Sequence, residues 1–210
     1  MFTGLIRHIG QLASRQQRGS GETIIIKADP ELLKRAGQGA SIAVMGVCLT
    51  AINRDEQTFS ADLSQETLTK TTLGNLNIGT ALNLEPALLL GEPIDGHQVT
   101  GHVDGVGTLL TRTENEGLWH FAFPYQLAPM LAPKGSIAID GISLTIVEIK
   151  NQTLTISLIP QTVSSTTLKN LATGAKVNLE VDPIGRYVAR HISLQTSNQK
   201  LQKFAKNGWK

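Results

Sequence analysis

The chain contains two copies of one long sequence pattern. Residues 41–85 align with residues 136–180 at an offset of 95 without a gap, and roughly 20 of the 45 paired positions are identical, whereas chance would give about one in twenty. "SIAVMGVCLT" in the first copy becomes "SIAIDGISLT" in the second. A weaker match at an offset of 97 pairs residues 3–12 with residues 100–109. A repeat of this length exceeds one solenoid unit and predicts a duplicated domain.

We therefore expect two homologous halves, residues 1–95 and 96–182, followed by a C-terminal segment of residues 183–210. Short runs such as "ETIIIKA" and "TLTISLI" are rich in β-branched residues, and several alternate with period two. Polar stretches such as "NRDEQ" are typical of hairpin turns. Because strands do not alternate with long helices, the pattern predicts an all-β fold of two small antiparallel barrels. "QETLTKTTLGNL" and "QTVSSTTLKNL" each allow a short helix.

One longer helix is predicted at the C-terminus. Asp182 suits the N-cap and Pro183 the first helical position. An apolar stripe follows at helical spacing, made of Ile184, Tyr187, Val188, His191 and Ile192. Because the second barrel is complete before this helix, we expect the stripe to pack on another subunit.

Composition excludes several classes of function. A net charge of +2 over 210 residues does not indicate a nucleic-acid partner. No apolar run approaches the length of a membrane span, and the N-terminus lacks a signal-peptide pattern, so no membrane partner is expected. Cys48 is the only cysteine, so an intrachain disulfide is impossible and a cytoplasmic protein is expected.

The two halves differ in polar character at four matched positions. The pairs, first half before second, are Cys48 and Ser143, Leu5 and His102, Met45 and Asp140, and Ala87 and Asp182. Cys48 is either a small buried apolar residue or a thiol beside a ligand. His102 is either a structural histidine or a proton carrier, and Asp182 is either only an N-cap or also functional. His97 and His102, five residues apart, would point to opposite faces of a strand, which disfavours a shared metal.

Several motifs together resemble the riboflavin synthase family, over about residues 1–190. They are "MFTG", "GVCLT", "TTLG", "GHVDG", "IDGISLT", "LIP" and "VNLEVD". The resemblance implies two six-stranded Greek-key barrels, each binding one 6,7-dimethyl-8-ribityllumazine. It implies transfer of a four-carbon unit between two lumazines, giving riboflavin and 5-amino-6-(D-ribitylamino)uracil, with no cofactor and no metal. It also implies a homotrimer, an active site between the first barrel of one subunit and the second barrel of a neighbour, and an association with lumazine synthase.

The resemblance also assigns residues. The positions it implies for catalysis are Ser41, Cys48, His102, Ser143, Thr145 and Asp182. Those it implies for substrate binding in the first barrel are Phe2, Gly4, Leu5, Ile6, Leu49, Thr50, Asp62, Leu63, Ser64, Gln65, Glu66 and Thr67. Those in the second barrel are Gly101, Val103, Lys134, Leu144, Leu158, Ile159, Pro160, Gln161, Thr162 and Val163. The two sets largely match under the repeat, and Gly39 stands opposite Lys134.

The reaction consumes two identical molecules in different roles, since one loses a proton from its C7 methyl group and the other accepts a nucleophile at C7. We hypothesise that Cys48 and His102, each unique to its half and contributed by different subunits, create the difference. Water, a ribityl hydroxyl, Ser143 or Thr145 are all open as the nucleophile. The alternative is a lumazine- or flavin-binding antenna without turnover, but such relatives tend to lack this cysteine and histidine. A flavin-dependent reductase would need a nucleotide-binding domain.

The chain departs from the family pattern at three positions. Met45 stands where Asn usually precedes Gly, Asp95 where Gly is common, and Gln161 where Glu is common. Met45 is expected to alter the strand geometry near Cys48.

Overall fold

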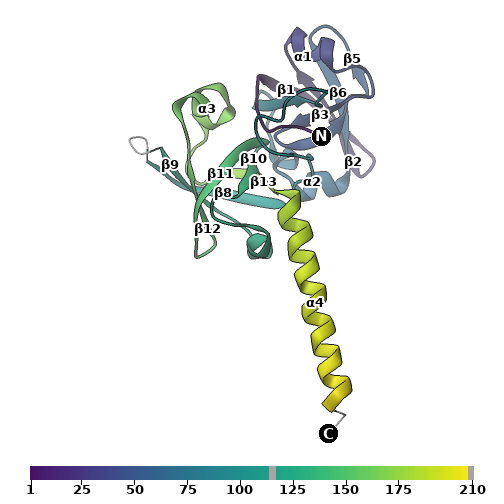
Figure 1. Ribbon diagram of the computed structural model, residues 1–210. Helices are drawn as coiled ribbons and strands as arrows, with labels where there is room; N and C mark the ends of the chain where they lie inside the picture. The colour runs from purple at the N-terminus through teal and green to yellow at the C-terminus, as the bar shows by residue number, and fades with distance from the viewer. Residues whose placement is uncertain (114–116, 208–210) are drawn as a thin grey trace.

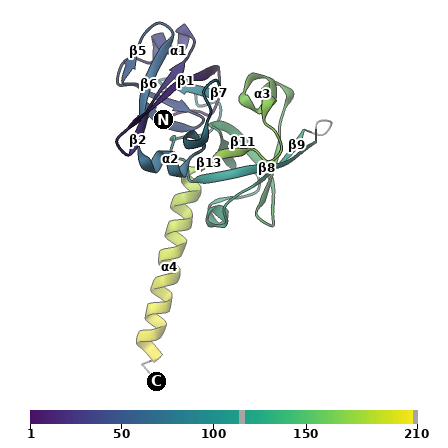
Figure 2. The same ribbon diagram turned by 180° about the vertical axis from the view of Figure 1, so that it is seen from behind.

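A computed structural model describes residues 1–113 and 117–207, with side chains up to Gln195. Two β-rich lobes lie side by side, and a long C-terminal helix extends away from both (Figures 1 and 2). The first lobe holds β1 (His8–Arg18), β2 (Gly21–Lys27), α1 (Pro30–Arg35), β3 (Ser41–Val44), β4 (Val47–Thr50), β5 (Asn53–Arg54), β6 (Thr58–Leu63), α2 (Gln65–Lys70), η1 (Thr72–Asn75) and β7 (Ala81–Pro86). The second holds β8 (Gly105–Thr113), β9 (Leu118–Ala122), η2 (Tyr125–Met130), β10 (Ser136–Ile139), β11 (Ile142–Lys150), β12 (Thr153–Ser157), α3 (Pro160–Ser165), η3 (Thr167–Asn170) and β13 (Lys176–Val181).

The second lobe is a closed six-stranded barrel, as expected. Its antiparallel strands follow the order β10-β11-β12-β9-β8-β13. The connections from β9 to β10 and from β12 to β13 join strands that are not neighbours, which is the Greek-key arrangement. Alternate side chains point inward and form one apolar core that includes Phe121, Leu154 and Leu179.

The first lobe differs from the predicted closed barrel. It is a seven-stranded sheet in the order β4-β3-β7-β1-β2-β6-β5. β4 and β5 together occupy the place of β11, but Ala51 and Ile52 interrupt them. In the second lobe, a bulge between Ile146 and Glu148 absorbs the same bend without breaking the strand. The Ile52 N–H still donates to the Ser60 carbonyl at 2.9 Å, so the sheet remains curled around its own apolar core.

Two matched hairpins meet where the lobes touch. Gly46 and Gly141 pack backbone to backbone, and a Cβ atom on Gly46 would lie 2.6 Å from the Gly141 nitrogen. Met45 and Asp140 precede these glycines with φ values of 49° and 48°, so both hairpins have the backbone of a type I′ turn. Met45 thus adopts the same turn backbone as its counterpart Asp140. Its Sδ accepts the Asn83 N–H at 3.2 Å.

Reciprocal hydrogen bonds from two matched asparagines join the lobes. The Asn83 side-chain amide donates to the Asp140 carbonyl at 3.0 Å, and its oxygen accepts the Thr167 N–H at 2.9 Å. Asn178 does the same in reverse, donating to the Met45 carbonyl at 2.8 Å and accepting the Thr72 N–H at 2.8 Å. Because both asparagines are buried, these bonds fix the relative orientation of the lobes.

Asp140 carries a fully buried carboxyl group at this junction. Its Oδ1 accepts the Asn178 N–H at 2.8 Å, whereas Oδ2 has no hydrogen-bond partner among the described residues. Burial penalises the charged form and raises the pKa of Asp140 to about 7.

We expect the free energy of unfolding to fall as the pH rises from about 4 to about 7. The folded chain holds a proton on Asp140 that the unfolded chain releases near 3.8, so the stabilising contribution is complete below that value and is lost as the pH rises through about 7. The slope of the Asp140 contribution approaches about 1.4 kcal/mol per pH unit; the raised pKa of Glu85 acts in the same direction, and the lowered pKa of His97 acts in the opposite one. Asp140→Asn should flatten the slope in urea titrations, and the exposed control Asp55→Asn should not. An unchanged slope in Asp140→Asn would contradict this account.

The C-terminal helix α4 (Pro183–Asn207) begins where predicted. The Ile184 N–H donates to Asp182 Oδ1 at 2.9 Å, and the Arg186 guanidinium donates to both carboxylate oxygens of Asp104 at 2.8 and 2.9 Å. Beyond this attachment the predicted stripe is exposed, with Tyr187 at 75%. Within residues 1–113 and 117–207, no helix is long and apolar enough to cross a membrane. Residues 208–210 of the expected basic tail lie outside the described residues.

Candidate active site

The leading segment of each half crosses to the other half. Phe2 and Val99, which match under the repeat, form a β-bridge with N···O distances of 2.7 and 3.1 Å. They pack with Ala43 and Ala138, another matched pair, into a small apolar cluster separate from the two cores. Phe2 is fully buried there, so it stabilises the crossing of the leading segment.

The segment from Gly101 to Val103 lies against the first lobe. The Cys48 N–H donates to the Gly101 carbonyl at 2.9 Å, and Val103 packs on the first core. Gly101 has a φ of 82°, and a Cβ atom there would lie 2.5 Å from the Cys48 Cβ. Only glycine therefore fits at position 101. Because His102 is the next residue, the same contact brings its backbone close to Cys48.

The segment from Gly4 to Ile6 mirrors this arrangement on the second lobe. The Ser143 N–H donates to the Gly4 carbonyl at 2.8 Å, and Ile6 packs on the second core. The prediction that Gly4–Ile6 lie in the same site as Cys48, and that a different subunit supplies His102 to it, is therefore wrong. Within one chain, Gly4–Ile6 lie against the second lobe and Gly101–Val103 lie against the first. The repeat identifies equivalent residues but does not reveal which barrel each one contacts.

We define the Cys48 half-site by the residues that the structure gathers on the first lobe. They are Ser41, Cys48, Leu49, Thr50, the segment 62–67, Gly101, His102 and Val103. Cys48 and Thr50 lie on the outer face of β4, whereas Leu49 points into the core. Ser41 pairs with Thr50 in the hairpin. The Thr23 hydroxyl donates a hydrogen bond to Asp62 Oδ1, with 2.5 Å between the oxygens, and Asp62 forms an ion pair with Arg18 at 3.3 Å.

The corresponding residues on the second lobe and in the segment that lies against it define the Ser143 half-site. They are Gly4, Leu5, Ile6, Lys134, Ser143, Leu144, Thr145 and the segment 158–163. Ser143 and Thr145 lie on the outer face of β11, and Thr145 and Ile159 are exposed. Lys134 adopts a φ of 66° at the turn before β10. Each half-site is thus built from both halves of one chain and opens onto the surface.

Comparison with known proteins identifies the family. The family model described as "Lumazine binding domain" matches residues 3–87 and again residues 100–182. The riboflavin synthase of Bacillus subtilis is 37% identical over 208 residues, which covers 98% of this chain and 96% of that protein. The chain belongs to the riboflavin synthase family. The riboflavin synthase of Mycobacterium bovis is 40% identical over 197 residues, covering 90% of this chain and 97% of that protein.

Solved structures of LumP resemble the chain in fold. LumP complexed with riboflavin superposes with a TM-score of 0.79 at 26% identity, covering 86% of this chain and 99% of LumP. LumP complexed with 6,7-dimethyl-8-(1'-D-ribityl)lumazine gives a TM-score of 0.78 at 25% identity. A scaffold of this kind therefore holds both a lumazine and a flavin in LumP.

His97 belongs to the candidate site of this riboflavin synthase family member, although the sequence does not predict it there. Its side-chain Nδ1 lies 2.7 Å from Ser143 Oγ, and its backbone N–H donates to the Thr3 carbonyl at 3.1 Å. Burial lowers the pKa of His97, although Asp182 and Glu180 act in the opposite direction. A neutral imidazole beside a hydroxyl can accept its proton. His97 lies outside the aligned segments of the repeat, and its contact with Ser143 Oγ places it at the Ser143 half-site.

Asp182 serves as the N-cap of α4 and also lies close enough to His97 to favour its charged form. The two histidines considered for a metal are separated, since His97 belongs to the Ser143 half-site and His102 to the Cys48 half-site. Among the described side chains, no group of three or more His, Cys, Asp or Glu residues could hold a metal ion.

Proposed function

We propose that the chain converts two 6,7-dimethyl-8-ribityllumazine molecules into riboflavin and 5-amino-6-(D-ribitylamino)uracil, one molecule bound at a Cys48 half-site and the other at a Ser143 half-site. The observation that carries this proposal is the pair of half-sites, which share a scaffold but differ in their reactive groups. A dismutation needs two similar pockets that treat identical molecules differently. Cys48 and His102 mark one pocket, and Ser143 with His97 marks the other.

The Ser143 half-site suits nucleophilic addition. Because neutral His97 contacts Ser143 Oγ, it can take the proton from that hydroxyl, or from a water in its place, as the oxygen adds at C7 of one lumazine. The Cys48 half-site would then hold the lumazine that loses a proton from its C7 methyl group, with Cys48 and His102 as the nearest groups able to take it. As the four-carbon unit passes from one lumazine to the other, the added oxygen leaves C7 and takes back its proton, and the proton removed from the methyl group is returned to the departing pyrimidinedione, so two lumazines give the two products with no atom left over.

We also propose that the two half-sites meet between subunits of a homotrimer. In a single chain, His102, Thr50 and Thr145 are exposed, and a reaction between two bound molecules requires a surface that excludes water and aligns them. The exposed stripe of α4 supports an oligomer. The cytoplasm is the proposed compartment, supported by the single cysteine, and association with lumazine synthase remains a prediction for co-elution experiments.

Incubation of the full chain with the lumazine tests the function. We expect riboflavin fluorescence to appear, with two lumazines consumed for each riboflavin formed. LumP is bound to the lumazine in one structure and to riboflavin in another, so an antenna is the second candidate. Tight binding of the lumazine without formation of riboflavin would overturn the enzymatic proposal and favour the antenna.

A further inference from the structure

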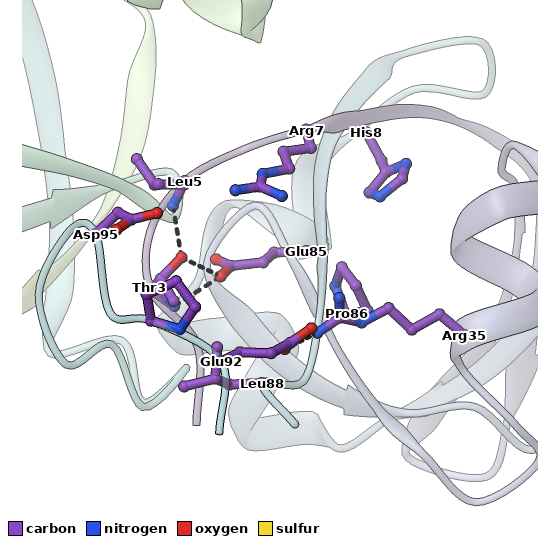
Figure 3. A pocket seen from close by; sticks show the side chains of 11 residues that line it. Thr3, Leu5, Arg7, His8, Arg35, Glu85, Pro86, Leu88, Glu92 and Asp95 are labelled. Atoms are coloured by element: carbon purple, nitrogen blue, oxygen red, sulfur yellow. Dashed lines mark hydrogen bonds and ion pairs between the residues drawn. The ribbon is translucent and has the colours of Figure 1, made fainter. Parts of the chain in front are cut away.

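Glu85 is a buried carboxylate that fixes the leading segment of the chain. It lies on β7, where one oxygen accepts the Thr3 N–H at 2.6 Å and the Thr3 hydroxyl at 2.8 Å. The other oxygen accepts the Gly4 N–H at 3.0 Å. Figure 3 shows this carboxylate in a cavity that Thr3 and Leu5 also line. All three donors belong to the segment that crosses to the second lobe.

Glu180 repeats the same arrangement in the second half. It lies on β13, the counterpart of β7, and accepts the Thr100 N–H at 2.7 Å and the Thr100 hydroxyl at 2.6 Å. Its second oxygen accepts the Gly101 N–H at 2.9 Å. Two carboxylates thus make the same three bonds to the two crossing segments.

The two glycines that donate to these carboxylates also accept, through their carbonyls, hydrogen bonds from the strands that carry Ser143 and Cys48. Gly4 donates its N–H to Glu85 and accepts the Ser143 N–H, and Gly101 donates to Glu180 and accepts the Cys48 N–H. We propose that Glu85 and Glu180 are positioning residues, each acting on the half-site of the opposite barrel: Glu85 on that of Ser143, and Glu180 on that of Cys48. The assignment of half-sites to a lumazine reaction rests on the proposed function.

A carboxylate is needed because every donor around it is an N–H or O–H group. A glutamine at either position would turn one acceptor into an NH₂ group facing a backbone N–H, so it would lose a bond and create a repulsive contact. The affected glycine would then shift against Cys48 or Ser143. Each substitution is therefore expected to disturb one half-site and not the other.

The matched variants Glu180→Gln and Glu85→Gln test this assignment. Alkylation of Cys48 by iodoacetamide reports on one half-site alone, because the chain has no other cysteine. We expect Glu180→Gln to change the alkylation rate by about fivefold or more and to abolish protection by riboflavin. Glu85→Gln should leave alkylation and protection within about twofold of the original chain, yet lower riboflavin formation by about tenfold or more.

Equal effects of both variants on Cys48, or no effect of Glu180→Gln, would overturn the proposal. If a glutamine variant fails to fold by circular dichroism, Thr100→Val and Thr3→Val each delete one hydroxyl bond and should give the same pattern at smaller size. Riboflavin protection of Cys48 does not depend on turnover. A chain that binds without converting lumazine would therefore contradict the proposed function while leaving the positioning test intact.

Discussion

A chain truncated after Arg186 should be monomeric, and its rate of riboflavin formation should be at least about a hundredfold lower than that of the full chain. This truncation keeps the Asp104–Arg186 ion pair and the N-cap of α4, so both lobes should remain folded. It removes Tyr187, Val188 and Ile192, which are at least half exposed in the single chain. Light scattering gives the mass, and fluorescence gives the rate.

The size of this effect follows from geometry. α4 spans 25 residues, or about 37 Å at the usual rise per residue, and projects from the lobes in both views (Figures 1 and 2). If two half-sites from neighbouring subunits must face each other, a monomer can bind the substrates but cannot hold them in register. Binding of riboflavin to the truncated chain should therefore survive although turnover does not.

Two substitutions in the full-length helix separate the possible causes. Replacing Tyr187 and Val188 together with Ser should reproduce the truncation, because it interrupts the apolar stripe at its middle but keeps the helix. Arg190→Ser, outside the stripe, serves as the control and should remain oligomeric. A truncated monomer with normal turnover would refute the intersubunit site, and a truncated chain that stays trimeric would refute the role of the helix.

The repeat made the fold largely predictable. The offset alignment located the paired strands and the two short helices, and the Asp182–Pro183 signal located the start of α4. Local pattern could not predict the break between β4 and β5, because it depends on how Ala51 and Ile52 bend as the folded sheet curls around its core. The second half solves the same bend with a bulge.

The candidate site was predicted less well than the fold. The alignment identifies Gly4 and Gly101 as equivalent, but their contacts are exchanged between the lobes, as the Gly4–Ser143 and Gly101–Cys48 hydrogen bonds show. His97 lies outside the aligned segments of the repeat, so comparison of the two halves predicts no role for it in the site. The folded chain brings its Nδ1 to Ser143 Oγ, a contact that no local pattern predicts.

Cys48→Ser combined with His102→Leu should lower the single-turnover rate of riboflavin formation by about 10²-fold or more, the usual size of a lost acid–base group. Each replacement is the residue that stands at the matched position of the other half, Ser143 or Leu5, so the variant removes the differences between the half-sites at these two positions and leaves His97 as the remaining reactive difference. Leucine and serine occur at these positions in the same scaffold, and Thr50 and the Gly101 contact remain, so lumazine binding should persist.

The converse variant is the control for this change. Ser143→Cys alone leaves Cys48, His102 and His97 in place, so it should keep the two half-sites distinct through their histidines and cost less than the double variant. Stopped-flow fluorescence at saturating lumazine measures the rate, and equilibrium titration measures binding. If the double variant turned over within about threefold of the original chain, the difference between the half-sites would have to come from elsewhere, and the His97–Ser143 contact would be its strongest remaining source.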